Sequence, residues 1–588
     1  MCGIAGEFRF DGNAPQQATM ARMLAKLARR GPDGEGQHVD GPVRLGHRRL
    51  AVIDLSERAR QPMIDPASGM ALVFNGTIYN YPELRAELQL RGHPFFSDGD
   101  TEVILRAYAE WGEACVERLH GMFAFAIWNR QTLFMARDRF GVKPLYYSHG
   151  PSYLRFASTP QALLAAGEVD TSIDPVALHH QFTLHAVIPA PRTIFNGVRK
   201  LAPGTTLTVD LQGKHHLRSY WDLHARRPAI ARTEAEWTEA IHDALRAAVK
   251  KRLEIADVKV GVLLSGGLDS SLLVALLAEQ GVKDLMTFSV GFEDQPEERG
   301  NEFEFSDAVA ERYATRHHKY LVPNGEVLSR LPEAIHAMSE PMVGQDTVAF
   351  YLLSEQVSKT VKVVQSGQGA DEVFGGYYWY PLMAAETSGS PLERFRRHYF
   401  DRDHGEFLRM VTPAYHGLDY TAQTVATCLD RPGADEFIDQ VLRMDVRTLI
   451  TDDPVKRVDN MTMAWGLEAR VPFLDHHLVE LAAQMPPELK LASGGKHVLK
   501  TIARGLVPDV VIDRKKGYFP MPALKYVRGD FLTFMRDILN SDTCRTRGLY
   551  QRDYVDMLLD APEQHHTRIQ GSKLWHLALL EYWLQQNA

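Results

Sequence analysis

The segment that most constrains this fold passes from an apolar strand, through a turn of small residues, into a helix. The strand is Val258–Leu264, the turn is Ser-Gly-Gly-Leu-Asp-Ser-Ser at 265–271, and a helical stretch follows from Leu272 to Gly281. Such a turn lets backbone N–H groups approach an anion closely, and the helix dipole adds to the attraction. A glycine-rich turn alone is often a simple chain reversal, but the full string predicts a phosphate cradle.

The second informative position is Cys2. Removal of Met1 would put a thiol and a free α-amine on one residue. Their unperturbed pKa values are about 8.5 and about 8, so the amine can take the thiol proton without a histidine. The alternative is that Cys2 is incidental, because many chains carry a small residue after the initiator methionine.

Composition limits the classes of protein to consider. A chain of 588 residues exceeds the roughly 250–300 at which one core stops growing, so two or more domains are expected. The net charge of −8 gives no electrostatic reason to expect a nucleic-acid or acidic-membrane partner. The four cysteines are scattered, which argues against zinc or disulfide frameworks and fits a reducing cytoplasm. No signal peptide or membrane span is visible.

Short apolar runs separated by Gly, Pro and Asp fill the first 215 residues or so. Strands are expected at 71–74, 122–128 and 133–136, and helices at 19–28 and 82–91. This pattern has no βαβ rhythm and indicates packed sheets of the α+β class. A polar linker at about 222–232 precedes a long amphipathic helix over 233–253, so we expect domains at 1–215 and 233–588.

Four N-terminal motifs carry a family resemblance. They are Arg-Arg-Gly-Pro-Asp at 29–33, Leu-Gly-His-Arg-Arg-Leu at 45–50, Phe-Asn-Gly-Thr-Ile-Tyr-Asn at 74–80 and Ser-Asp-Gly-Asp-Thr-Glu at 97–102. About the first 200 residues resemble the glutaminase domain of class II, N-terminal-nucleophile amidotransferases, which implies an αββα sandwich. The resemblance implies that Cys2 attacks the glutamine amide, with Asn75 and the Gly76 N–H forming the oxyanion hole. Arg49 would bind the glutamine carboxylate and Asp100 its ammonium.

The 265–271 string resembles the pyrophosphate loop of ATP pyrophosphatases, which split ATP into AMP and pyrophosphate. It lacks the Gly-Lys-Ser/Thr of a Walker loop, so γ-phosphate transfer is disfavoured. The resemblance implies an α/β domain of the adenine-nucleotide α-hydrolase type. The ATP contacts that it implies are Ser265, Gly266, Gly267, Asp269, Ser270, Ser271, Ser289 and Gly367.

Carboxylates beside a phosphate loop suit Mg²⁺, so Asp269 and Asp371 are metal candidates, with N-cap or turn residues as the alternative. Residues 459–464 and 467–475 resemble the C-terminal signature of asparagine synthetases, where we expect Glu468, Arg470 and Asp475 to form buried ion pairs. The loop 514–519 aligns with the one that carries an essential lysine, which falls on Lys516. Lys516 would oppose the pyrophosphate charge, unless it belongs to a solvated basic turn.

Taken in order, the motifs resemble glutamine-hydrolysing asparagine synthetases along nearly the whole chain. The implied reaction uses ammonia from glutamine, carried through a dry internal passage, to amidate a carboxylate adenylated by Mg-ATP. Two positions depart from that family. Gln368 and Thr77 stand where asparagine synthetases carry glutamates, which leaves Asp100 as the remaining carboxylate for the glutamine ammonium.

Gln368, the aromatic run 377–380 and the stretch 519–525 look closest to N-acetylglutaminylglutamine amidotransferases, which make a dipeptide amide used as a compatible solute. Asparagine synthesis from aspartate stays open, as does an inactive glutamine-sensing or scaffold protein, although the intact loop motifs argue against the latter. A tRNA-modifying pyrophosphatase is disfavoured, because no basic patch interleaved with aromatics is present. The expected partners are glutamine, ATP and a carboxylate acceptor. The oligomeric state stays open, with a homodimer as one option.

Overall fold

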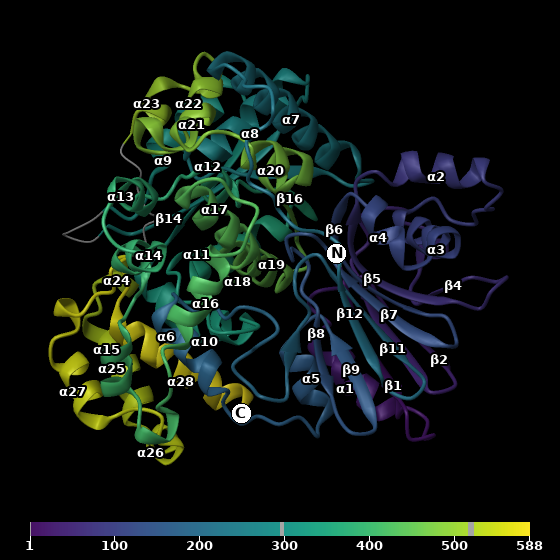
Figure 1. Cartoon of the computed structure of the whole chain (residues 1–588). Coiled ribbons are helices and arrows are strands. Elements are labelled where there is room, and N and C mark those ends of the chain that lie inside the picture. Colours follow the sequence, from purple (N-terminus) through teal and green to yellow (C-terminus); the bar gives the residue numbers. More distant parts are fainter. Residues whose placement is uncertain (1, 295–298, 515–521) are drawn as a thin grey trace.

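The computed structural model describes residues 2–294, 299–514 and 522–588. The first part of the chain forms two antiparallel sheets, seen in purple and blue in Figure 1, and the rest surrounds a parallel sheet. None of the helices in these ranges is long and apolar enough to cross a membrane.

Each antiparallel sheet has six strands. The first runs β10 (Arg199–Lys200), β8 (Tyr146–His149), β9 (Tyr153–Ala157), β1 (Gly3–Arg9), β3 (Val43–Arg49), β2 (Gly34–Asp40). The second runs β12 (His215–Ser219), β11 (Thr205–Asp210), β7 (Thr132–Arg137), β6 (Gly121–Trp128), β5 (Ala71–Ile78), β4 (Met63–Ile64).

An apolar core lies between these sheets, built from alternate residues such as Ala71 and Val73 of β5. The opposite face of β5 packs through Leu72 and Phe74 against helices α2 to α4. The helices of this part are α1 (Gln17–Lys26), α2 (Tyr81–Leu90), α3 (Asp100–Trp111), α4 (Cys115–Arg118), α5 (Pro160–Ala166) and α6 (Pro175–Thr183). With α1 and α5 against the first sheet, the order is helix, sheet, sheet, helix, which confirms the expected αββα sandwich.

The second part has a five-stranded parallel sheet in the order β15 (Arg316–Val322), β14 (Met286–Phe292), β13 (Val260–Leu263), β16 (Val363–Gln365), β17 (Glu468–Arg470). Its central strands are apolar and buried, as expected for a sheet covered by helices on both faces. The expected α/β class is confirmed.

The helix predicted over 233–253 is α7 (Glu234–Glu254), which Thr233 and Glu236 begin with a capping box. The other helices of this part are α8 (Leu268–Glu279), α9 (Phe303–Arg312), α10 (Asn324–Ala337), α11 (Asp346–Ser358), α12 (Ala370–Phe374), α13 (Trp379–Ala385), α14 (Pro391–Tyr399), α15 (His404–Met410), α16 (Tyr420–Leu429), α17 (Phe437–Arg447), α18 (Leu449–Asp452), α19 (Pro454–Met463), α20 (His476–Ala483), α21 (Pro487–Leu491), α22 (His497–Ala503), α23 (Asp509–Ile512), α24 (Pro522–Lys525), α25 (Gly529–Asn540), α26 (Asp542–Arg547), α27 (Arg552–Asp560) and α28 (Lys573–Asn587).

Buried charges hold the two parts together. Asp459 of α19 accepts from Arg30 Nη1 at 2.9 Å and from Lys143 Nζ at 3.1 Å, and all three side chains are buried. Taking charges out of water is costly, so such a cluster persists only when each charge is matched. The cluster therefore locks α19 onto the sandwich.

We expect Asp459→Asn to destabilise the protein by about 3–5 kcal/mol, because it leaves two buried cations without their counter-charge. Denaturant unfolding should show the loss as an earlier midpoint. Asp430 is exposed, so Asp430→Asn is the matched control and should unfold like the wild type. Equal midpoints for the two variants would contradict this account.

Candidate functional site

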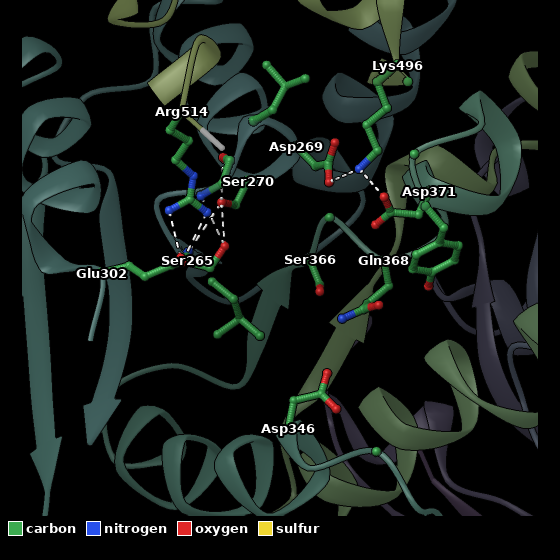
Figure 2. Close-up of a pocket in the computed structure, with 18 of the residues that line it drawn as sticks. Ser265, Asp269, Ser270, Glu302, Asp346, Ser366, Gln368, Asp371, Lys496 and Arg514 are labelled. Atoms are coloured by element: carbon green, nitrogen blue, oxygen red, sulfur yellow. Dashed lines mark hydrogen bonds and ion pairs between the residues drawn. The ribbon is translucent and has the colours of Figure 1, made fainter. Parts of the chain in front are cut away.

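The carboxyl ends of β13, β14 and β16 meet at one cavity of about 950 Å³. Figure 2 shows the side chains that project into it from the loops after these strands. Ligands of open parallel sheets bind at this edge, where loops and helix N-termini converge. The cavity is therefore the first candidate for a nucleotide site.

The turn after β13 has the geometry of an anion cradle. Gly266 has a φ of +76°, and a Cβ there would lie 2.8 Å from the backbone nitrogen of Ser306, so only glycine fits. The Ser270 hydroxyl accepts the Ser265 N–H at 3.2 Å, which closes the turn onto the first residues of α8. The N-terminus of α8 thus opens at the cavity, where its unpaired N–H groups favour negative charge.

Most of the residues expected to contact ATP line this cavity. Those in the lining are Ser265, Gly267, Asp269, Ser270, Ser289 and Gly367. Gly266 and Ser271 are not in the lining: Gly266 shapes the turn, and Ser271 is fully buried in α8.

A buried lysine lies between the two metal candidates (Figure 2). Lys496 Nζ is 2.6 Å from Asp269 and 2.7 Å from Asp371, so both carboxylates face one point in the cavity. Burial alone would lower the pKa of Lys496, but these two carboxylates raise it above its ordinary value. The ammonium therefore stays charged.

Our sequence reasoning missed Lys496. The signal was present in the Gly-Gly-Lys turn at 494–496 that begins α22, because two glycines let a lysine side chain approach a phosphate site closely. The lysine that we predicted for this role, Lys516, lies outside the described residues.

The other end of the cavity holds paired charges. Arg457 Nη1 binds Asp346 at 2.7 Å and Asp453 at 3.2 Å. His185, which follows α6, lines the same end, and its Nδ1 is 2.9 Å from the buried Asp401 carboxylate. Gln368 also lines the cavity, and Figure 2 shows its amide between Lys496 and Asp346. This end thus presents an amide beside basic groups that each face a carboxylate.

Cys2 lies in a second constellation, in the sandwich. Its backbone N–H donates to Asn75 Oδ1 at 3.0 Å, which joins the start of β1 to β5. Burial raises the pKa of the Cys2 thiol. Asn75 Nδ2 is buried and has no hydrogen-bond partner among the residues that the structure describes. A Cβ on Gly76 would lie 2.2 Å from the Met122 oxygen, so no side chain fits there.

Arg49 and Asp100 belong to the same region. Arg49 donates from Nη1 to the Ser56 oxygen at 3.1 Å and from Nη2 to the Asp54 oxygen at 2.5 Å, which fixes its orientation. Its positive charge acts on the Cys2 thiol. Asp100 begins α3 and accepts the Ile78 N–H at 3.0 Å.

Two of the expected ion pairs are present. Arg470 Nε is 2.6 Å from Glu468, and Arg252 is 3.1 Å from Asp475. Both pairs lie where α7 and β17 approach the sandwich, at the end of β5. The parallel sheet therefore contacts the region of Cys2 through charged residues.

Comparisons with known proteins identify the two domains. Residues 1–221 match the glutamine amidotransferase domain, and residues 240–585 match asparagine synthase. Asparagine synthetase [glutamine-hydrolyzing] 1 of Bacillus subtilis is 31% identical, with 100% of this chain and 97% of that protein covered. Asparagine synthetase [glutamine-hydrolyzing] 3 of the same organism is 32% identical, with 95% of this chain and 93% of that protein covered. Amidase chry2 of Gibberella zeae is 28% identical over 89% of each. The chain belongs to the asparagine synthase family and is a glutamine-dependent ligase with a class II amidotransferase domain.

Proposed function

We propose that this amidotransferase releases ammonia from glutamine at Cys2 and transfers it to the carboxylate of N-acetylglutaminylglutamine, activated by ATP as an adenylate. The product would be a dipeptide amide, a compatible solute made in the cytoplasm. The observation that carries the choice of acceptor is the end of the cavity around Gln368, where Arg457 and His185 already face carboxylates.

In the glutaminase half, the thiol of Cys2 attacks the glutamine side-chain amide and ammonia leaves as a thioester forms. The α-amine of Cys2, once exposed, takes the thiol proton. Asn75 Nδ2 and the Gly76 N–H would donate to the developing oxyanion. The buried, unused donor on Asn75 supports this role, because a buried donor without a partner is costly unless a ligand completes it. Arg49 would bind the glutamine carboxylate and Asp100 its ammonium.

In the synthetase half, the turn 265–271 and the N-terminus of α8 would hold the phosphates of ATP. Asp269 and Asp371 would hold Mg²⁺, which prefers carboxylate oxygens and when bound neutralises phosphate charge. Both carboxylates contact the same ammonium, so they lie close enough together to bind one Mg²⁺ ion. Lys496 would remain beside the pyrophosphate as a fixed positive charge.

The acceptor end favours a body rich in amides. Aspartate would bring a second carboxylate and an ammonium, and two basic residues of the lining, Arg457 and His185, already face carboxylates. N-acetylglutaminylglutamine has one carboxylate and a neutral body, and its amides can pair with both the donor and the acceptor of Gln368. Asparagine synthesis is the second candidate, favoured by the similarity to the asparagine synthetases of Bacillus subtilis.

We expect AMP release with Mg-ATP and glutamine to be at least 10²-fold more efficient with N-acetylglutaminylglutamine than with aspartate. Gln368→Glu should lower kcat/KM for the dipeptide, because a carboxylate there lacks the amide donor group and adds a negative charge. Coupled measurement of AMP and of the amidated product checks both. Conversion of aspartate with the dipeptide inert would assign the protein to asparagine synthesis.

Cys2→Ala should abolish glutamate release from glutamine yet leave AMP release from added ammonium salts within a few-fold of the wild type, since only the nitrogen source is lost. Cys428→Ala is the control, because Cys428 lies outside both constellations. Equal loss of both activities in Cys2→Ala would contradict separate sites.

Lys496→Gln should lower AMP formation by about 10²–10³-fold, because a preorganised charge is lost where negative charge develops. Glutamate release should persist. The exposed Lys283 provides the control variant Lys283→Gln, expected to match the wild type. If Lys496→Gln formed AMP at the wild-type rate, the cluster with Asp269 and Asp371 would have no part in the chemistry.

A further inference from the structure

A contact between the two domains lies directly at the glutaminase constellation. Thr77 Oγ1 of β5 donates to Glu468 Oε1 of β17 at 3.1 Å, and both side chains are buried. Arg470 Nε donates to the same oxygen at 2.6 Å, which fixes the carboxylate. A glutamate of the parallel sheet therefore reaches into the strand that carries Asn75 and Gly76.

Side chains of β5 point alternately to its two faces, and this places the contact near Asn75. Side chains two residues apart on a strand share a face, so Thr77 and Asn75 point to the same side. Asn75 accepts the backbone N–H of Cys2, and the N–H of Ile78 donates to Asp100. The nucleophile, the expected ammonium ligand Asp100 and the carboxylate of Glu468 are thus all attached within four consecutive residues of one strand.

Asp100 is a weak counter-charge for an ammonium by itself. Burial raises the pKa of Asp100 to about 7, and the negative charge of Glu468 adds to the rise. No basic side chain lies within ion-pair distance of Asp100 in the described part of the chain. A carboxyl group that titrates near neutrality is partly protonated, and its neutral form attracts a cation little.

The pKa of Glu468 is shifted in the opposite direction from that of Asp100. Burial alone would raise the pKa of Glu468, but the charge of the terminal amino group, followed by that of Arg470, lowers it to about 2. Its carboxylate is therefore ionised throughout the neutral range. It lies beside Thr77, whose own side chain offers a hydroxyl and no charge.

We propose that Glu468, a residue of the synthetase domain, is a binding residue of the glutaminase site and supplies with Asp100 the negative charge that receives the α-ammonium of glutamine. The glutaminase site is then complete only when β17 is docked against β5. The affinity for glutamine then depends on residues of both domains.

The test compares two substrates in the full-length enzyme: glutamine, and glutaramate, which is glutamine without its amino group. Glu468→Gln keeps the shape of the side chain and removes its charge. We expect the KM for glutamine to rise about 10- to 100-fold with kcat within threefold, as for loss of one charged hydrogen bond. The KM for glutaramate should not change, because that substrate has no ammonium to bind.

Glu340→Gln is the matched control. Glu340 is also a buried glutamate that joins the domains, with Lys200 Nζ at 3.0 Å, but it is far along the chain from β5 and β17. It should leave both KM values unchanged. Thermal unfolding of each variant shows whether it is folded.

Thr77→Val provides a second route if Glu468→Gln does not fold. It removes the hydroxyl that orients Glu468, so it should raise the KM for glutamine several-fold and spare glutaramate. An unchanged KM for glutamine in the folded variants would overturn the proposal. So would an equal rise for glutamine and glutaramate, which is the result expected of a purely structural ion pair.

Discussion

Arg30 is the residue on which the joining of the two halves most depends. Its Nη1 binds Asp459 of α19 at 2.9 Å, and its Nε donates to the backbone oxygen of Cys2 at 3.3 Å. One buried guanidinium therefore contacts both Cys2, the proposed nucleophile, and the synthetase domain. Because its five N–H donors are held in a rigid plane, this one side chain can contact α19 and Cys2 at the same time. The geometry of the first reaction is tied to the docking of the second domain.

Different charged side chains lie at the two ends of the large cavity. Near α8, the carboxylates of Asp269 and Asp371 converge on the ammonium of Lys496. At the other end, Arg457 and His185 are each matched by carboxylates. We propose that the first end holds the phosphates of Mg-ATP and the second the body of the acceptor.

Much of the fold was predictable from local patterns. The strands of 71–74, 122–128 and 133–136 lie within β5, β6 and β7, because apolar runs bounded by turn residues leave few alternatives. The capping residue Thr233 placed the start of α7 to within one residue. The phosphate turn was predictable for the same reason, since strand, turn and helix are continuous in sequence.

The missing parts of the sites were not local. Lys496 meets Asp269 across 227 positions of sequence, and Glu468 meets Thr77 across 391. Glu468 was expected to be a structural ion pair, and its bond with Arg470 confirms that pair, but the contact with Thr77 depends on how the domains dock. No periodicity or spacing encodes such a contact. Only the tertiary arrangement brings these groups together.

The position of His185 has a consequence for engineering. It lines the end of the large cavity that we propose binds the acceptor, yet it lies within the 1–221 segment that matches the amidotransferase domain. In Figure 1, α6, which it follows, lies among the helices of the second part. In a chimera that exchanged C-terminal domains at the linker, His185 would come from one parent and the other residues that line the cavity from the other parent. To keep the acceptor specificity of one parent, the crossover would have to lie before α6. The segment that contributes to this specificity would then begin before the boundary between the two domains.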